Sequence, residues 1–557
     1  PMITASTIVF VALGAIFAYS FYAVLVAGQL SLGQAGFASL AAFTAAAVTP
    51  DPDQIGDLPA LLLAVLIGMA VGAAAALLLG LPTMRLRGVF LAIATLGFAE
   101  AVRILMLNQE WTGGANGLPV PRVVTPAIAW LALILVGYWF WRMGPSRYGR
   151  ALAAIREDEL AARAMGVDVG RHRLAAFVTA GAVAGLYGVL WAYYVRLIAP
   201  EDFNFAAAID GLVTAFVGGS TLFLGPLLGS GFLTLVPELQ RWFGIEAGWI
   251  RPFLAGVLLL AVILFLPGGL AGLIPRRTRV PAPAEEDEAA GRAHPERGAV
   301  VAELVGVSKE YGGVHAVADV DLELRGGEVV GLIGPNGAGK TTLVNLITGI
   351  VPPSAGRITV LGVDATRLPM HRIAAAGVSR TFQHSKLFDR LTVLENVLVG
   401  THLVARPTFL RRLFWLPSAW RDEFAARRRA AACLRRVGLL DRAGDRAAAL
   451  SYGDQRRLEI ARALAADPSL LILDEPAAGM NQVEAEELTE LITGLARDGL
   501  TILLIEHNVG MVLRICDRIV VLDFGAVLAT GTPDEIAADP EVVDAYLGSA
   551  AADEGGR

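Results

Sequence analysis

Long apolar runs, separated by short polar segments, make up most of the first half of the chain. A helix that crosses the hydrocarbon core of a membrane needs about 20 consecutive apolar residues. Taken singly, each run could be the buried helix of a soluble protein, but their close succession excludes that interpretation. The pattern therefore predicts an N-terminal α-helical polytopic membrane domain over residues 1–275. The eight runs are residues 3–27, 30–49, 60–82, 88–108, 125–143, 174–198, a compound run 206–236, and 250–274.

The arginines between these runs predict how the helices are oriented. Loops rich in Arg and Lys remain on the cytoplasmic side of a membrane. Residues 144–173 contain six arginines, and others lie at Arg85, Arg87 and residues 276–279, so these parts should be cytoplasmic. Residues 50–59 contain three aspartates and no basic residue, and they should face outward.

The last three apolar runs have an expected cytoplasmic loop at both ends, so an even number of crossings must lie between those loops. Glycines and a proline interrupt the run 206–236 at residues 218–220 and 225–226. We therefore expect this run either to cross twice as short helices or to re-enter and return, with residues 237–249 outside. Non-helical backbone at such depth is tolerated only inside protein or beside water.

Three polar segments of this half are candidates for function. Residues 28–37 place glycines and glutamines between apolar runs, which predicts either part of a transport pathway or a packing motif with hydrogen-bonded glutamines. Residues 112–117 are rich in glycine and are expected to be a plain outer loop. Residues 149–166 are amphipathic and should form one helix that Gly166 ends. We expect this helix to dock into a groove on a soluble domain rather than to remain a solvated surface helix.

The second half of the chain alternates short apolar strands with helical segments. Residues 299–557 have the composition of a soluble domain, and continuous apolar strands are typical of a parallel sheet covered on both faces. We therefore expect a C-terminal α/β domain there. Residues 276–298 are rich in Pro, Ala and Glu and are predicted to be a flexible linker. The predicted strands are residues 304–324 around a turn, 329–333, 470–474 and 501–505.

Composition and charge narrow the possible functions. Hydrophobic residues make up 55% of the chain and charged residues only 18%, below the usual quarter, which agrees with a membrane half. The net charge is −6 and no basic patch with interleaved aromatic residues is present, so we expect no nucleic-acid partner. The two cysteines, Cys433 and Cys516, favour a reduced cytosol over a disulfide framework or a zinc site. The N-terminus has no basic region, so we expect no signal peptide.

A glycine-rich loop at residues 334–342 follows the strand 329–333 and precedes a helix. Its sequence GPNGAGKTT allows successive backbone N–H groups to surround phosphate oxygens, and the helix N-terminus adds partial positive charge. With that strand and helix in place, a chance glycine-rich turn is the weaker interpretation. We expect Lys340 to reach the β- and γ-phosphates and the Thr341 hydroxyl to bind Mg²⁺. The candidate nucleotide ligands are Gly334, Asn336, Gly337, Gly339, Lys340, Thr341 and Thr342.

Acidic and polar side chains follow other strands of the same predicted sheet. Asp474 and Glu475 end an apolar strand at the edge where ligands bind in open α/β sheets. Asp474 is a candidate Mg²⁺ ligand, and Glu475 is a candidate catalytic base that orients or deprotonates the attacking water. His507 follows the strand 501–505 and is a catalytic candidate for contact with the γ-phosphate, unless it bonds only to backbone. Gln383 is a candidate for binding Mg²⁺ or the water, unless it is a plain surface residue.

Two further features point to nucleotide binding. Tyr311 lies about one strand before the glycine-rich loop and could stack on adenine, although a turn aromatic is the simpler interpretation. Residues 450–455 open a helix, with Ser451 as its N-cap and Gly453 leaving the backbone N–H groups accessible. This second helix N-terminus has no evident use within one domain, but it could bind the ATP of a second domain that faces it.

In order and spacing, these motifs resemble the nucleotide-binding domain of an ABC transporter, an α/β P-loop ATPase. Within that class, residues 451–462, 476–481 and 531–548 are similar to the ATPase subunits of branched-chain (hydrophobic) amino acid importers. The first half resembles the permease of the same importers at residues 28–37, 85–88, 112–118, 149–166 and 265–270. The chain is therefore identified as a natural fusion of the permease subunit and the ATP-binding subunit, which are often separate proteins in the family.

The resemblance implies an ATP hydrolase that drives import of a branched-chain or other hydrophobic amino acid, or a related amide, urea or organic acid. It implies ATP and Mg²⁺ as cofactors and residues 149–166 as the coupling helix. The implied partners are a second permease subunit, a second ATPase subunit, a periplasmic or extracellular solute-binding protein, and membrane lipid. The implied location is the bacterial cytoplasmic (inner) membrane, with a multi-pass permease and the ATPase domain in the cytoplasm.

Two other functions remain as alternatives, an ABC exporter half-transporter and a non-transporting membrane ATPase sensor. The short cytoplasmic loops argue against the exporter, whose class has long charged helical extensions. The sequence also departs from the common ABC pattern at Tyr452, Asp454 and Asn481. Asp454 places a carboxylate near a helix N-terminus, where it could weaken phosphate capture. Glu475, the expected catalytic glutamate, is intact.

Overall fold

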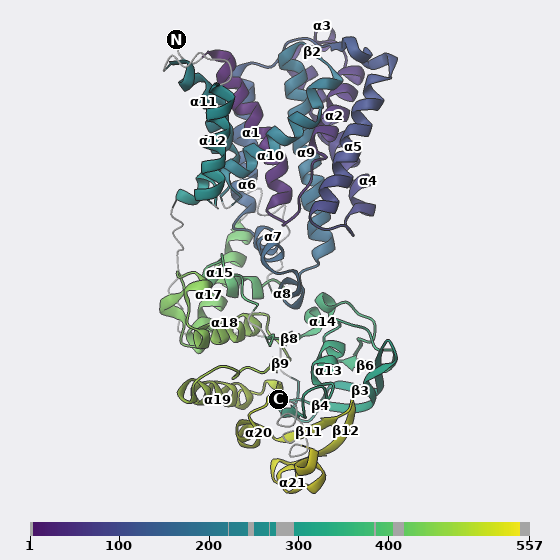
Figure 1. Cartoon of the computed structure of the whole chain (residues 1–557), viewed down its shortest axis with the longest axis vertical. Coiled ribbons are helices and arrows are strands. Elements are labelled where there is room, and N and C mark those ends of the chain that lie inside the picture. The colour runs from purple at the N-terminus through teal and green to yellow at the C-terminus, as the bar shows by residue number, and fades with distance from the viewer. Residues whose placement is uncertain are drawn as a thin grey trace. The chain divides into compact units, whose positions relative to one another are not determined.

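The computed structural model describes residues 4–220, 222–242, 250–266, 268–274, 295–383, 386–404 and 417–545. Residue contacts divide the chain into two compact units (Figure 1). The first unit comprises Pro1–Arg156 and Val169–Arg276, and the second comprises Glu157–Asp168 and Arg277–Arg557. The short segment Glu157–Asp168 thus groups with the second unit, although helices of the first unit flank it in the sequence. Most of the predicted linker 276–298 lies outside the described residues.

The first unit is a bundle of helices (Figure 1). Their bounds are α1 (Ala5–Leu25), α2 (Gln34–Val48), α3 (Pro52–Ile55), α4 (Asp57–Thr83), α5 (Val89–Leu107), α6 (Pro126–Met143), α7 (Arg147–Glu157), α9 (Val169–Val195), α10 (Phe205–Gly218), α11 (Gly225–Trp242) and α12 (Ile250–Phe265). Among the described residues, five helices are long and apolar enough to cross a membrane: α1, α4, α5, α6 and α9. Shorter apolar helices are α2, α10 and the first part of α11.

Each predicted apolar run contains a helix, but several helix ends differ from the prediction. The run 206–236 forms the two helices α10 and α11, as its glycine interruptions predict, and α11 continues to Trp242. A Cβ atom added at Gly218 would lie 1.9 Å from the carbonyl oxygen of Gly225, so the two helices approach closely at this break. The expected outward position of residues 237–249 extends beyond the described residues and stays a prediction, as does the parity argument.

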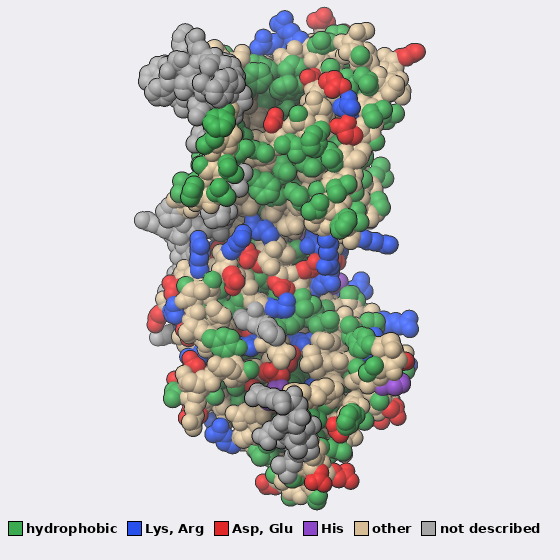
Figure 2. All heavy atoms as spheres, in the orientation of Figure 1, with side chains coloured by type: hydrophobic (Ala, Val, Ile, Leu, Met, Phe, Trp, Pro, Cys, Tyr) green, Lys and Arg blue, Asp and Glu red, His purple; other side chains and the backbone are tan. Residues whose placement is uncertain are grey.

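Glycines allow α4 and α9 to pack closely against each other. A Cβ atom added at Gly72 would lie 2.2 Å from the carbonyl oxygen of Gly181, and one at Gly185 would lie 2.2 Å from that of Gly68. Inside lipid, where apolar burial does not drive association, such close backbone contact holds helices together. Large apolar side chains such as Leu78 remain exposed on the outside of the bundle, and Figure 2 shows hydrophobic side chains over much of its visible face.

The two glycine-rich polar segments of the first unit are packed rather than open. Between α1 and α2, Gln29 and Gln34 are buried, yet Oε1 of Gln29 and Nε2 of Gln34 have no hydrogen-bond partner among the described residues. The other amide atom of each is bonded: Nε2 of Gln29 donates to Sδ of Met84 at 3.2 Å, and Oε1 of Gln34 accepts from the Ser31 hydroxyl at 3.3 Å. The packing motif and the transport pathway both stay predictions.

Residues 112–117 lie in short 3₁₀ turns between α5 and α6, where the buried Thr112 hydroxyl donates a hydrogen bond of 2.5 Å to the carbonyl oxygen of Met106. That they are a plain outer loop stays a prediction.

The helix predicted over residues 149–166 is in fact two helices. The first, α7, ends at Glu157, and α8 (Glu159–Ala164) follows Asp158. Asp158 has extended backbone angles, φ −149° and ψ 116°, and its carboxylate accepts a hydrogen bond of 2.7 Å from the backbone N–H of Ala161. The prediction of a single helix fails because Asp158 acts as the N-cap of a new one.

The second unit contains two sheets. The larger has the strand order β12-β11-β5-β10-β9-β8 and is parallel except for β12. The smaller is antiparallel with the order β4-β3-β6-β7. The bounds are β3 (Val300–Tyr311), β4 (Val314–Arg325), β5 (Val329–Ile333), β6 (Ala355–Val360), β7 (Val363–Asp364), β8 (Val378–Arg380), β9 (Leu470–Asp474), β10 (Thr501–Ile505), β11 (Arg518–Asp523) and β12 (Ala526–Gly531).

Apolar side chains fill both faces of the six-stranded sheet. Along β5, Val329 and Ile333 belong to a core shared with helices, and Val330 and Leu332 belong to a core shared with the smaller sheet. Burial on both faces explains why these strands are continuous apolar runs in the sequence. The described helices of this unit also include α13 (Lys340–Ile347), α14 (Met370–Ala376), α15 (Val393–Gly400), α17 (Pro417–Arg436), α18 (Tyr452–Ala465), α19 (Gln482–Arg497), α20 (Val509–Ile515) and α21 (Pro533–Ala538).

Candidate active site

Four neighbouring strands bring most of the predicted site residues to one edge of the larger sheet. The glycine-rich loop follows β5, His507 follows β10, Glu475 follows β9, and Gln383 lies just after β8. The sheet order β5-β10-β9-β8 makes these loops neighbours in space. The carboxyl ends of parallel strands are where ligands bind in open α/β sheets, so this edge is the candidate active site.

The loop at residues 334–339 turns tightly between β5 and α13, with backbone close on two sides. A Cβ atom at Gly334 would lie 2.1 Å from the carbonyl oxygen of Leu522, and one at Gly339 would lie 2.3 Å from that of Ala316. Gly339 also has φ 97°, a left-handed backbone conformation that residues with a side chain rarely adopt. Glycine is therefore required at both positions to keep the loop in the shape that predicts a phosphate cradle.

Lys340 begins α13, and its side chain reaches back to the loop. Its Nζ donates hydrogen bonds to the carbonyl oxygens of Gly334 at 2.6 Å and Pro335 at 2.9 Å, and only 6% of the residue is exposed. Burial lowers the pKa of Lys340, while the charges of Glu475 and Asp474 act in the opposite direction. The ammonium group is therefore held against the loop, where the two carboxylates favour its charged form.

The other predicted ligands in this loop are accessible to solvent. Asn336, Gly337 and Thr341 are exposed, and Thr342 is half-buried. Thr341 follows Lys340 directly in the first turn of α13, so its hydroxyl is available to a ligand at the helix N-terminus.

Glu475 is held from two sides immediately after β9. Its Oε2 accepts a hydrogen bond of 2.9 Å from Nε2 of Gln383, and its Oε1 lies 2.8 Å from Nε2 of His507. The backbone of Glu475 has φ 48°, and its N–H donates a hydrogen bond of 2.8 Å to the carbonyl oxygen of Ile505. Gln383 and His507 are thus part of one cluster with a carboxylate, the arrangement that a general base and its supporting groups require.

Glu506 supports this cluster and was not among the predicted residues. Its Oε1 accepts a hydrogen bond of 2.7 Å from the backbone N–H of Ala477, and its Oε2 accepts one of 3.1 Å from that of His507. Burial raises the pKa of Glu506, and these backbone donors offset part of that effect. The acidic residue directly before His507 at a strand end was the sequence signal for it.

Asp474 is buried, and only one of its two carboxylate oxygens is paired. Oδ2 accepts a hydrogen bond of 2.7 Å from Nη2 of Arg380, whereas Oδ1 has no partner among the described residues. A carboxylate oxygen without a donor suits a hard cation such as Mg²⁺, which prefers oxygen ligands. The residues present therefore fit Mg²⁺, with Asp474 as one ligand and Thr341 and Gln383 as further candidates. Arg380, the last residue of β8, was missed by the sequence analysis.

Ser451 and Gly453 begin α18 and do not join this cluster. The Ser451 hydroxyl accepts a hydrogen bond of 3.2 Å from the backbone N–H of Asp454, which confirms the predicted N-cap. A Cβ atom at Gly453 would lie 2.8 Å from Oε1 of Glu484 on α19. In the part of the chain that the structure describes, no hydrogen bond connects Ser451 or Gly453 to the loop at residues 334–339.

Two of the three departures from the common ABC pattern, Asp454 and Asn481, have structural explanations. Asp454 forms an ion pair of 3.0 Å with Nη1 of Arg442, which also pairs with Asp445 at 3.0 Å. The carboxylate at the start of α18 is therefore neutralised nearby. Asn481 is the N-cap of α19, because its side chain accepts a hydrogen bond of 3.0 Å from the backbone N–H of Glu484.

Tyr311 ends β3 at the turn into β4 and is half exposed. Nζ of Lys309 lies 5.1 Å from the centre of its ring. The second strand of this hairpin reaches the glycine-rich loop, where the carbonyl oxygen of Ala316 lies against Gly339. The placement leaves the ring of Tyr311 accessible, and its contact with adenine stays a prediction.

The segment Glu157–Asp168 packs within the second unit, where α8 contacts α14. Asp158 forms an ion pair of 2.7 Å with Lys386, and Asp168 lies 3.8 Å from His371 at the start of α14. The alternative of a solvated surface helix is therefore wrong for this segment. Its buried apolar residues are Ala161, Ala162, Ala164, Met165 and Val167.

Comparison with known proteins covers both halves of the chain. A family model described as the permease component of the branched-chain amino acid transport system matches residues 2–265. Models described as ABC transporter and as branched-chain amino acid ATP-binding cassette transporter match residues 317–478 and 526–552. The high-affinity branched-chain amino acid transport ATP-binding protein LivG of Salmonella typhimurium is 49% identical over 246 residues, which are 44% of this chain and 96% of LivG. This chain belongs to the branched-chain amino acid ABC transporter family.

Other relatives of this ABC transporter match the same half. The high-affinity branched-chain amino acid transport ATP-binding protein BraF of Pseudomonas aeruginosa is 45% identical over 251 residues, 45% of this chain and 98% of BraF. A crystal structure of an ABC transporter cassette in its ADP conformation is 30% identical, with a TM-score of 0.39, and covers 45% of this chain and 99% of the cassette. As a family member, the chain combines a multi-pass membrane permease and an ATP-binding, ATP-hydrolysing domain in one polypeptide.

Proposed function

We propose that this transporter imports a small solute, driven by ATP hydrolysis, as one permease–ATPase half of a larger assembly. The observation that supports this most is the position of Glu475, which Gln383 and His507 hold at the ligand edge of the sheet. The same compact unit contains the docked segment Glu157–Asp168, which continues into the permease helices on both sides. Hydrolysis thus has a direct physical connection to the membrane half.

In the hydrolytic step, Glu475 orients the attacking water and accepts its proton. Lys340 and the backbone N–H groups of the loop at residues 334–339 bind the phosphates. Gln383 and His507 keep the Glu475 carboxylate at the strand end by the hydrogen bonds described above, and His507 contacts the γ-phosphate. Such a positioned base typically contributes about 10²–10⁴-fold in rate.

The metal ion we propose is Mg²⁺, held by Asp474, Thr341 and Gln383. The support is the unpartnered Oδ1 of the buried Asp474 and the accessible hydroxyl of Thr341 at the start of α13. When bound, Mg²⁺ neutralises charge on the phosphate oxygens. We further propose that Tyr311 stacks on the adenine.

The active site is proposed to be completed by a second ATPase subunit. Ser451 and Gly453 lie at the N-terminus of α18, which attracts anions, yet among the described residues no hydrogen bond joins them to the loop of their own unit. We propose that they bind the ATP of the partner and that the partner supplies the equivalent helix to Lys340. A second permease subunit, a periplasmic or extracellular solute-binding protein and membrane lipid complete the proposed assembly. Its proposed location is the bacterial cytoplasmic (inner) membrane, with the ATPase domain in the cytoplasm.

The solute we propose is a branched-chain or other hydrophobic amino acid. The support is the similarity to LivG and BraF, which are high-affinity branched-chain amino acid transport ATP-binding proteins, and to the permease component of the branched-chain amino acid transport system. A related amide, urea or organic acid would need the same machinery, because solute selection is largely the task of the binding protein.

The test is solute flux in sealed proteoliposomes that contain this chain and its neighbouring permease and ATPase subunits. Radiolabelled leucine and the binding protein are placed on the side opposite the ATPase domains, and ATP on the ATPase side. We expect ATP-dependent movement of leucine toward the ATPase side. Movement in the opposite direction would indicate an exporter, and hydrolysis without movement of any of the named solutes would indicate a sensor.

A further inference from the structure

Arg380, the last residue of β8, connects three parts of the second unit through one buried side chain. Its guanidinium Nη2 donates to Oδ2 of Asp474 at 2.7 Å, and only 4% of the side chain is exposed. Its Nη1 donates to Oδ1 of Asn345 at 2.6 Å and to the hydroxyl of Thr348 at 3.3 Å. The guanidinium therefore links the end of β9 to α13, the helix that begins with Lys340.

These hydrogen bonds determine which oxygen of Asp474 is available to a ligand. A guanidinium is planar and its donors form a rigid fork, so anchoring one nitrogen fixes the direction of the other. Asn345 and Thr348 anchor Nη1 from α13, and Nη2 is thereby aimed at Oδ2. Oδ1 is left without a partner among the described residues and is the oxygen that remains for a cation.

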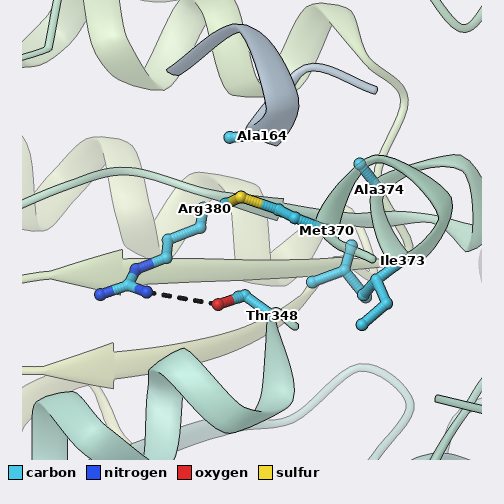
Figure 3. A pocket seen from close by; sticks show the side chains of 7 residues that line it. Ala164, Thr348, Met370, Ile373, Ala374 and Arg380 are labelled. Carbon is cyan, nitrogen blue, oxygen red and sulfur yellow. Dashed lines mark hydrogen bonds between the residues drawn. The ribbon is translucent and has the colours of Figure 1, made fainter. Parts of the chain in front are cut away.

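A small cavity lies between Arg380 and the docked segment Glu157–Asp168 (Figure 3). Its volume is about 10 Å³, close to the space that one water molecule needs. Nε of Arg380 has no hydrogen-bond partner among the described residues. Figure 3 shows the lining side chains Ala164, Met370, Ile373 and Ala374 together with Arg380 and Thr348.

The cavity makes the packing of Arg380 sensitive to the docked segment. Ala164 is the last residue of α8, and it lines the cavity together with Met370, Ile373 and Ala374 of α14. Side chains that border an unfilled space lack packing partners on that side, so a shift of α8 changes the contacts of the other lining side chains, Arg380 among them. The side chain next to this space is the one that aims at Asp474.

We propose that Arg380 is a positioning residue for Asp474, and that the docked segment acts on the metal-binding carboxylate through the cavity it shares with Arg380. Arg380 itself contacts neither nucleotide nor metal. The proposal rests on the proposed function, in which Asp474 binds Mg²⁺ and Glu157–Asp168 transmits movement between ATPase and permease.

The first test compares the variants Arg380→Lys and Arg380→Met in the full chain assembled with its partner subunits. The P-loop lysine of the partner ATPase is replaced by alanine, so that only this chain's site is measured. Mn²⁺ binding is followed by electron paramagnetic resonance with a non-hydrolysable ATP analogue. Loss of a group that orients a ligating carboxylate typically weakens metal binding by about 10–100-fold, and we expect this for both variants.

The variant Arg380→Lys distinguishes positioning from charge, because lysine keeps the positive charge but lacks the forked donors of the guanidinium. If Arg380 acted only by repelling the metal, Arg380→Met would tighten Mn²⁺ binding and Arg380→Lys would leave it unchanged; either result overturns the proposal. If Arg380 had only a structural role, its substitution would lower the unfolding temperature without changing the Mn²⁺ dissociation constant. That result would also overturn the proposal. Binding of a fluorescent ATP analogue in EDTA should stay within about twofold of the unchanged protein.

The second test fills the cavity from α14. Ala374→Val adds two methyl groups inside the cavity, and Ala375→Val makes the same change at an exposed position of α14. We expect Ala374→Val to weaken Mn²⁺ binding at least about threefold and Ala375→Val to leave it unchanged. Equal Mn²⁺ binding in both variants would refute the route through the cavity. Failure of solute uptake by the unchanged assembly, with these metal-binding results intact, would instead contradict the proposed function.

Discussion

At Glu475, backbone and side chain are constrained together. A left-handed φ of 48° is uncommon for a residue with a side chain and costs free energy of order 1–3 kcal/mol, so the surrounding structure must enforce it. The bond from its N–H to Ile505 and the side-chain bonds to Gln383 and His507 supply that enforcement. Strain of this kind is typical of catalytic positions, and here it holds the carboxylate at the edge of the sheet.

The first prediction concerns this carboxylate. Glu475→Gln keeps the size and the hydrogen-bonding capacity of the side chain but removes the base. We expect hydrolysis at this site to fall by about 10²–10⁴-fold while ATP binding is unchanged. Phosphate release and binding of a fluorescent ATP analogue measure the two effects, with Glu490→Gln on the exposed face of α19 as the control. Equal loss of binding and hydrolysis would contradict the role as a base.

The second prediction concerns the pair of Arg442 and Asp454. Arg442→Gln leaves a carboxylate unneutralised in the first turn of α18, where the partner's ATP is proposed to bind. A charge at a helix end is typically worth about 0.3–1 kcal/mol, so the ATP concentration for half-maximal activity should rise roughly two- to fivefold. Asp454→Asn in the Arg442→Gln background should restore it, and lack of rescue would exclude charge as the cause.

Which residues could be predicted depended on how far apart the partners lie in the sequence. Lys340, Asp474 and Glu475 belong to contiguous motifs whose strand and helix context is local. The pair of Arg380 and Asp474 spans 94 residues. No periodicity or spacing can reveal such a pair, because it exists only after the sheet has formed.

At the scale of elements, α18 connects its own N-terminus to the segment that carries Gln383. Arg456 donates hydrogen bonds to the carbonyl oxygen of Phe382 at 2.7 Å and to Glu459 at 3.0 Å. Glu459 accepts one of 2.8 Å from the backbone N–H of Lys386, and Arg462 donates one of 2.7 Å to the Lys386 carbonyl oxygen. The backbone around Lys386 is therefore fixed to α18, while its side chain holds Asp158 of the docked segment.

The break in the helix predicted over residues 149–166 belongs to this scale as well. Local propensity favoured a continuous helix over these residues. The break follows from Asp158, which caps α8 and also pairs with Lys386 across 228 positions of the sequence. The contact with Lys386 favours the conformation in which Asp158 caps α8. A prediction from local propensity cannot include a contact between such distant parts of the sequence.

The third prediction tests this contact. Asp158→Asn keeps an N-cap for α8 but removes the charge that pairs with Lys386. Partly exposed ion pairs are typically worth about 0.2–1 kcal/mol, so solute transported per ATP should fall by up to about fivefold while hydrolysis changes less. Glu157→Arg, which replaces a carboxylate 3.8 Å from Nε of Arg390 by a positive charge, should act in the same direction.

Uptake and phosphate release from the same proteoliposomes give the ratio directly. Glu159→Gln is the control, because Glu159 pairs with Arg163 within α8. A parallel fall of uptake and hydrolysis with normal assembly would assign the segment a folding role.

At the scale of the whole molecule, the division into a membrane half and an ATPase half could be predicted from composition and from the period of the apolar pattern. The membrane half was predicted as successive apolar runs, and the ATPase half as a sheet of buried strands. The assignment of Glu157–Asp168 to the second unit was not expected as a domain boundary. Its buried apolar residues pack within the second unit rather than against a membrane. Only the three-dimensional contacts show this.

The fourth prediction is that this chain is catalytically incomplete when alone. Ser451 and Gly453 have no described bond to the loop of their own unit, so a facing ATPase domain must complete each site. We expect low ATPase activity and no uptake from the purified chain, and solute-stimulated activity after addition of the neighbouring subunits. Robust solute-stimulated uptake by a homodimer of this chain would falsify the heteromeric assembly. Ser451→Arg should impair hydrolysis at the partner's site and not at Glu475.

The docking of Glu157–Asp168 onto the ATPase domain also changes how tightly permease and ATPase must bind each other in this transporter. Where permease and ATPase are separate proteins, the contact between them must be strong enough to keep two molecules together. Here both sides of the contact are parts of one polypeptide, so docking is intramolecular and is governed by an effective concentration, which is typically millimolar for tethered modules. The contact can therefore be weak and short-lived without loss of the ATPase. Because the two parts are fused, the residues of this contact need not bind tightly. They can instead be selected for rapid release.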